Sequence, residues 1–221
     1  MSSDVASTRS LSGPSAERGF SLIEILVVIT IIGMLMGFSA VAVSRYRETG
    51  RITQCDSQLK AIALLCEGYA ERMGDYPPSR LVALGVKDAP NEINMGVEAL
   101  CAALRAKDYA GGRPNDDWLG NTDEDSSASL DSIDGTSALL ELLDPWDNPI
   151  VYIVQSDYEQ DFTVRLDSEG LIEDVSVRAT KNPMTGAWFR FESYQLRSAG
   201  PDGLLDTDDD IANYEIPDAE G

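Results

Sequence analysis

The pattern of apolar and polar positions changes twice along the chain. Residues 25–43 contain no charged side chain, and a helix of about 20 apolar residues is long enough to cross the hydrocarbon core of a bilayer. After this run, apolar residues recur at spacings of three and four, which is typical of one face of a helix. The pattern therefore predicts one long helix with a membrane-spanning first part, residues 20–43, and an amphipathic second part, residues 44–73. The apolar positions of the second part are Ile52, Cys55, Leu59, Ile62, Cys66, Tyr69 and Met73.

The predicted helix ends at Gly74, because a candidate glycine C-cap is followed by Pro77 and Pro78, which cannot continue a helix. We expect one face of the amphipathic part to pack on a domain and the polar residues off that face to lie in solvent. A short coiled coil is the alternative. The polar residues are Arg51, Gln58, Lys60, Glu67 and Glu71.

Residues 74–221 are expected to form a globular domain of mixed α and β structure. From residue 150 onward, short runs rich in β-branched and aromatic residues alternate with turn residues. The predicted fold class is α+β, with a small antiparallel sheet packed on the long helix. Helices are predicted at residues 96–107 and 136–143, an acidic surface loop at 115–134, and strands at 150–154, 162–166, 172–177 and 188–196.

The charge balance argues against two classes of function. The chain has 17 Lys and Arg against 38 Asp and Glu, a formal net charge of -21, so the phosphates of a nucleic acid would be repelled. It contains no His, which removes the commonest general base and the Ser-His and Cys-His nucleophile pairs. We therefore expect neither a nucleic-acid-binding protein nor an enzyme.

The three cysteines are too few and too scattered for a zinc site or a disulfide scaffold. On one helix, Cys55 and Cys66 would lie roughly 16 Å apart, which is too far for a bond. Either could meet Cys101 in an oxidising compartment. Burial of all three as small hydrophobic residues is the favoured interpretation.

A single carboxylate stands at the beginning of the apolar run. Residues 18–24 read RGFSLIE, so Glu24 lies about one turn inside the predicted membrane helix. An acidic side chain near the centre of such a helix costs about 2.5 to 3.5 kcal/mol on insertion scales, and Glu24 is therefore expected to have a partner. The alternative is that Glu24 lies at the level of the lipid headgroups and reaches water.

This segment resembles the class III signal of type IV prepilins and pseudopilins, in which a polar leader ends in glycine before Phe-Ser/Thr-Leu-Ile-Glu. The resemblance implies that a prepilin peptidase cleaves after Gly19 and removes residues 1–19. It implies that the new amino group of Phe20 is methylated and that the apolar helix is retained. It also implies that Glu24 pairs with the Phe20 amino group of a neighbouring subunit during filament assembly.

An ordinary secretory signal peptide is the rival interpretation of the apolar run. Ala40-Val41-Ala42 has the form of a signal-peptidase site, although the run is longer than the usual 7 to 15 residues and Glu24 would interrupt it.

Gly33 and Gly37 form a G-x-x-x-G pattern, which allows close approach of neighbouring helices. That pattern is weak evidence by itself.

Two later segments resemble the major pseudopilins of type II secretion systems. Residues 74–77, GDYP, are similar to the break after the first helix of that family. Residues 144–152, DPWDNPIVY, are similar to the family's Asp-Pro-Trp-Gly-Asn-Pro-Tyr-x-Tyr. Asp147 replaces the glycine, which predicts a looser turn.

An acidic segment near the carboxyl terminus predicts a Ca²⁺ site. Crowded carboxylates repel one another, and a hard cation can collect six to eight oxygens. Residues 198–211 resemble the carboxyl-terminal calcium loop of the major pseudopilins; a solvated acidic turn is the alternative. A second cation site at residues 121–125 is less favoured, because no glycine follows them. The candidate ligands are Asp202, Asp206, Asp208, Asp209 and Asp210.

The resemblance implies a structural role. The protein would be a single-pass inner-membrane protein with its globular domain in the periplasm. It would assemble with copies of itself and with minor pseudopilins, on an inner-membrane assembly platform, into a periplasmic pseudopilus that drives protein export. A subunit of another type IV pilus-like filament and a secreted calcium-binding domain are the alternatives.

Overall fold

The computed structural model describes residues 20–215, apart from the side chains of residues 37–45. Gly19 and the rest of the predicted leader lie outside the described part, as do the surroundings of Gly37 and the side chains of Ala40-Val41-Ala42. The chain divides into two compact units, Met1–Arg45 and Tyr46–Gly221.

Helix α1, Leu22–Met73, begins in the first unit and ends in the second. At its start, the carbonyl oxygen of Ser21 accepts hydrogen bonds from the backbone N–H groups of Glu24 (2.9 Å) and Ile25 (3.2 Å). At its end, Gly74 has a φ of 89° and donates to the carbonyl of Ala70 at 2.9 Å, as a glycine C-cap does. Within the described side chains, no helix combines the length and the apolar character that crossing a membrane requires.

The second unit is built on one face of α1. Cys55, Leu59, Ile62, Cys66 and Tyr69 are buried in its main core, as their spacing predicts. The ends of the predicted stripe, at residues 52 and 73, are exposed. The second half of α1 is thus the amphipathic element that the sequence indicates.

The prediction that Gln58 faces solvent is wrong. Its side chain is buried, and its amide nitrogen donates to the carbonyl of Leu143 at 2.6 Å. Because Gln58 neighbours Leu59, it lies at the margin of the packed face, where its amide satisfies a carbonyl that would otherwise lack a donor.

Helix α2, Met95–Arg105, confirms the first predicted helix of the globular domain. It packs closely on strand β3, Val151–Val154: a Cβ at Gly96 would lie 2.3 Å from the carbonyl oxygen of Tyr152. Glycine is therefore required at this crossing.

The helix predicted at residues 136–143 is wrong. Strand β2, Glu141–Leu142, lies there instead and pairs antiparallel with β1, Leu119–Gly120. The buried residues Leu139 and Leu142 are three apart, a spacing that suits a helix, but the hydrogen bonds to β1 select extended structure.

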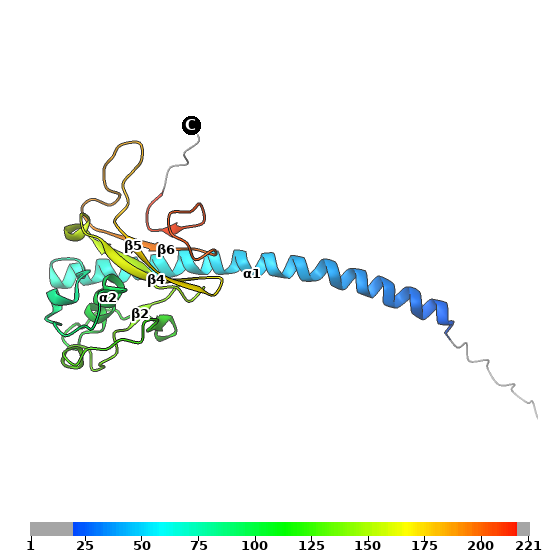
Figure 1. Ribbon diagram of the computed structural model, residues 1–221, viewed down its shortest axis with the longest axis horizontal. Coiled ribbons are helices and arrows are strands. Elements are labelled where there is room, and N and C mark those ends of the chain that lie inside the picture. The colour runs from blue at the N-terminus through cyan, green and yellow to red at the C-terminus, as the bar shows by residue number, and fades with distance from the viewer. Residues whose placement is uncertain (1–19, 216–221) are drawn as a thin grey trace, which may run out of the picture. The chain divides into compact units, whose positions relative to one another are not determined.

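The strands form three small antiparallel sheets rather than one. Figure 1 shows the hairpin of β4, Phe162–Ser168, and β5, Leu171–Val177, and also β6, Tyr194–Ser198, in the globular unit. The strand predicted at residues 188–196 begins later, because residues 189–193 form turns and Arg190 has a φ of 49°. Besides the β1–β2 pair, one sheet contains β3, β6 and β7, Ile211–Ala212, with β6 in the middle. The other sheet is the β4–β5 hairpin.

The segment predicted as an acidic surface loop, residues 115–134, is partly buried. Asp125, Ser127 and Leu130 are inside the protein, so the prediction is wrong for this part. Short 3₁₀ helices add to the irregular structure here and elsewhere: η1, Leu81–Leu84; η2, Asp116–Trp118; η3, Leu130–Ser132; and η4, Gln155–Asp157.

All three cysteines are buried and their thiols are free. Burial raises the pKa of Cys55 to about 11 and that of Cys101 to about 12, so both are protonated thiols at neutral pH. This agrees with the interpretation of the cysteines as small hydrophobic residues.

We predict that Leu59→Ala destabilises the protein by about 2 to 5 kcal/mol, since it leaves a cavity beneath α1. The measurement is urea unfolding of the detergent-purified chain. Leu64→Ala is the matched control on the same helix: Leu64 is 74% exposed, against 2% for Leu59, and its loss should cost less than about 0.5 kcal/mol. Equal effects of the two substitutions would contradict the assignment of the buried face.

Candidate functional site

The amino-terminal segment presents an apolar surface. Every described side chain of residues 20–36 is exposed, including Phe20, which is 77% exposed. Glu24 lies in the first turn of α1 and is also exposed. Among the described residues of its own unit, no element covers this stretch of helix, so its apolar side chains are available to lipid or to other helices.

The acidic segment near the carboxyl terminus forms a closed loop. Its base is the antiparallel pair of Ser198 with Ile211. Gly200 and Gly203 have φ values of 66° and 69°, and a Cβ at Gly200 would lie 2.2 Å from the carbonyl oxygen of Asp209. The loop therefore depends on glycine to bring its two sides together.

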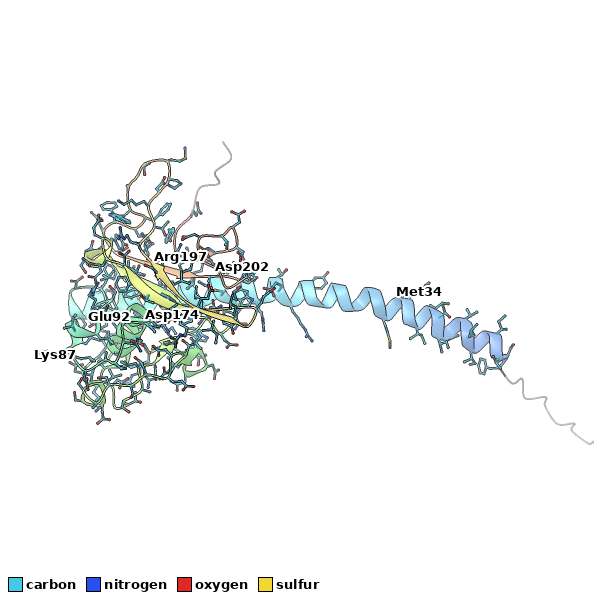
Figure 2. The ribbon with its side chains drawn as sticks, in the orientation of Figure 1. Met34, Lys87, Glu92, Asp174, Arg197 and Asp202 are labelled. Carbon is cyan, nitrogen blue, oxygen red and sulfur yellow. The ribbon has the colours of Figure 1, made fainter. Side chains whose placement is uncertain are left out.

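The five carboxylates of this loop have different partners. Arg197, labelled in Figure 2, donates to Asp206 Oδ1 at 2.5 Å and to Asp210 Oδ2 at 3.5 Å. Burial raises the pKa of Asp210 to about 6, and the charge of Arg197 opposes this rise. Asp209 accepts from the backbone N–H of Asp202 at 3.1 Å. Within the described residues, the five do not gather into one cluster of three or more oxygens at metal-binding distance.

The turn at residues 144–149 connects this loop to the rest of the unit. The Asp144 carboxylate accepts from the backbone N–H groups of Trp146 (2.9 Å) and Asn148 (3.0 Å) and from the Ser198 hydroxyl (2.6 Å). The indole N–H of Trp146 donates to Glu48 Oε1 on α1 at 2.9 Å. The base of the acidic loop is thereby bonded to the same turn that contacts α1.

The predicted loosening of this turn by Asp147 is wrong. Asp147 adopts a φ of 67°, the conformation in which glycine is usual, and its backbone N–H donates to the carbonyl of Asp144 at 3.0 Å. Asp tolerates this left-handed conformation better than most residues, so the turn stays closed.

A second group of carboxylates is buried in the globular unit. Oxygens of Glu98, Asp123 and Glu141 all lie within 4.8 Å of one another, so this acidic cluster has the donor atoms to hold a metal ion. Sequence reasoning missed Glu98 and Glu141, which are distant from the loop at residues 121–125. One signal was present: Glu98 is the only charged residue among residues 95–104.

Comparison with known proteins gives two matches. Residues 14–40 match the prokaryotic N-terminal methylation motif. The chain is 25% identical over 199 residues to the type II secretion system core protein G of Pseudomonas aeruginosa, and the match covers 90% of this chain and 96% of that relative. No solved structure matches.

Proposed function

We propose that this chain is a structural subunit of a pseudopilus that serves protein export. Its resemblance to the type II secretion pseudopilins is confirmed by the methylation motif and by the similarity to core protein G. The main support for this proposal is the extent of the similarity to core protein G. It covers 90% of the chain and so includes the globular unit as well as the amino-terminal motif.

The maturation that this function requires begins at the motif. A prepilin peptidase would cleave after Gly19, the amino group of Phe20 would be methylated, and residues 25–43 would anchor the subunit in the inner membrane. The globular unit would then lie in the periplasm, and the subunit would reach the filament through an inner-membrane assembly platform.

The exposed apolar side chains of residues 20–36 support assembly through this helix. Packing of several such helices would remove their apolar surface from lipid and would surround Glu24 with apolar groups. A carboxylate in that environment needs a cationic partner. The amino group of Phe20 on a neighbouring subunit would supply it. Minor pseudopilins would be further partners in the filament.

We predict that Glu24→Ala abolishes filament formation, because it removes the partner of the neighbour's amino group while the helix stays apolar. The measurement is electron microscopy of filaments from cells that overproduce the chain together with its assembly apparatus. Glu71→Ala is the matched control, since Glu71 is an exposed residue of the same helix. It should leave filament number unchanged.

Mass spectrometry of the purified proteins completes this experiment. The wild-type chain and the Glu24→Ala variant should both begin at methylated Phe20, which shows that the variant is inserted and cleaved. Filaments of normal length in the Glu24→Ala variant would contradict the pairing role. A mature terminus at Val43 would show that the run is an ordinary signal peptide and would overturn the proposal.

The carboxyl-terminal loop is proposed to bind one Ca²⁺. Support comes from the closed glycine turns and from Asp210 Oδ1, which is buried and has no hydrogen-bond donor among the described residues. Arg197 neutralises part of the charge on Asp206 and Asp210. The proposed ligands are therefore drawn from Asp202, Asp206, Asp208, Asp209 and Asp210, with backbone carbonyls completing the shell.

We predict that Asp202→Ala lowers the bound calcium by one ion per chain and reduces the calcium-dependent rise in melting temperature, because the variant loses a ligand of an ion that stabilises the folded state. Equilibrium dialysis of the detergent-purified chain and thermal melting monitored by circular dichroism measure the two effects. Asp131→Ala, which changes an exposed carboxylate on the 3₁₀ helix η3, should alter neither. Unchanged calcium binding in Asp202→Ala would refute the loop assignment.

A further inference from the structure

Four carboxylates from three separate segments meet between α2 and β2, which Figure 1 labels in the globular unit. Glu98 comes from the first turn of α2, Asp123 and Asp125 from the loop after β1, and Glu141 from β2. The side chain of Asn91 joins two of them, since its amide nitrogen donates to Asp123 Oδ2 at 3.1 Å and to Asp125 Oδ2 at 3.2 Å.

Three oxygens of this group are buried without a hydrogen-bond donor among the described residues. They are Glu98 Oε1, Asp123 Oδ1 and Asp125 Oδ1. Glu98 is only 2% exposed, and its carboxylate is directed toward Asp123 and Glu141. Buried polar atoms are nearly always satisfied in folded proteins, so three orphaned oxygens at one place indicate a missing positive partner.

The fourth carboxylate is held in place by donors around it. Glu141 Oε1 accepts from the amide of Asn94 at 2.7 Å, and Oε2 accepts from the backbone N–H of Thr122 at 3.0 Å. Asn94 is itself fixed, because its side-chain oxygen accepts from the backbone N–H of Arg165 at 2.9 Å. The group is therefore a positioned set of ligands rather than a flexible acidic surface.

No basic side chain neutralises these four residues in any ion pair of the described part of the chain. The guanidinium of Arg165 donates instead to both oxygens of Asp174, at 2.7 and 3.0 Å. This differs from the carboxyl-terminal loop, where Arg197 contacts two carboxylates. Burial, together with the neighbouring carboxylates of Asp125 and Asp123, raises the pKa of Glu98 to about 10.

We propose that Glu98, Asp123, Asp125 and Glu141 bind a calcium ion, at a site separate from the carboxyl-terminal loop. A purely oxygen ligand set selects hard cations. Ca²⁺ binds oxygens at about 2.3 to 2.6 Å, so two of its ligand atoms lie at most about 5 Å apart. The oxygens of Glu98, Asp123 and Glu141, which lie within 4.8 Å of one another, satisfy this. Mg²⁺ fits less well, because it requires near-ideal octahedral geometry and retains several waters, for which a buried group of side chains has little room.

Such an ion would connect α2, the loop after β1 and strand β2, in addition to the hydrogen bonds from the side chains of Asn91 and Asn94 and from the backbone N–H of Thr122. Residues 119–142 contain only short regular elements. The ion would therefore fix a segment with little secondary structure of its own against α2. The competing account is that Glu98 is a neutral carboxylic acid that shares its proton with a neighbouring carboxylate.

The test measures calcium binding by equilibrium dialysis of the full chain in detergent, after removal of metal with chelator. The Asp202→Ala background is used, so that the carboxyl-terminal loop does not contribute. We expect this chain to bind one Ca²⁺ and Glu98→Gln to weaken that binding at least tenfold. Glu92→Gln is the matched control, since Glu92 is exposed and lies six residues before Glu98. It should bind as the background does.

Further measurements show whether weaker calcium binding reflects loss of a ligand rather than unfolding of the variant. Asp125→Asn should weaken calcium binding as Glu98→Gln does, and circular dichroism should show both variants folded in chelator, because Gln and Asn have nearly the shapes of the residues they replace. Calcium should raise the melting temperature of the background chain but not of Glu98→Gln. If the background binds no calcium, or if Glu98→Gln binds it unchanged, the shared proton is the correct account and the proposal is wrong.

Discussion

The globular unit depends on one apolar face of a single helix. The residues from Cys55 to Tyr69 that face the core are covered by α2, β3 and β6. Two tyrosines of these strands hydrogen-bond to α1 and to the segment that follows it. The hydroxyl of Tyr194 donates to the carbonyl of Ala63 at 3.0 Å, and that of Tyr152 donates to the carbonyl of Pro77 at 2.6 Å. The same helix has an amino-terminal stretch whose described apolar side chains have no such cover. Lipid or other molecules would have to cover this apolar surface, which is the physical basis of the proposed assembly.

A strongly acidic chain must also accommodate the carboxylates that its fold buries, and three solutions occur. Asp144 is satisfied by two backbone N–H groups and a serine hydroxyl. Asp210 is satisfied in part by the charge of Arg197. The group around Glu98 has neither enough donors nor a basic partner, and a bound cation is the remaining solution that keeps all of its members ionised.

The sequence predicts the parts of this structure that follow from local pattern. The spacing from Cys55 to Tyr69 identifies the buried face of α1, and residues 162–177 predict the β4–β5 hairpin. Errors arise where long-range pairing decides: residues 136–143 contain β2 because β1 is available to bond with them, and Gln58 is buried because Leu143 provides an acceptor. Strand β7 is missed since two residues are too short to give a pattern.

The candidate sites also differ in whether the sequence alone reveals them. The amino-terminal motif and the carboxyl-terminal acidic loop are contiguous in sequence, so residue order alone identifies them. The buried acidic group combines residues up to 43 positions apart, from Glu98 to Glu141, and only the fold brings their oxygens together. A charged residue within an apolar helix, as Glu98 is within α2, is the one sequence signal that points to it.

Deletion of the gene in the cell that makes this protein distinguishes a role in secretion from a role in a surface pilus. The fate of exported proteins and the presence of surface pili are then measured together. A role in secretion predicts that exported proteins accumulate in the periplasm, that the wild-type gene restores their release, and that surface pili and the movement they power are unaffected. Loss of the pili with normal protein export would contradict it.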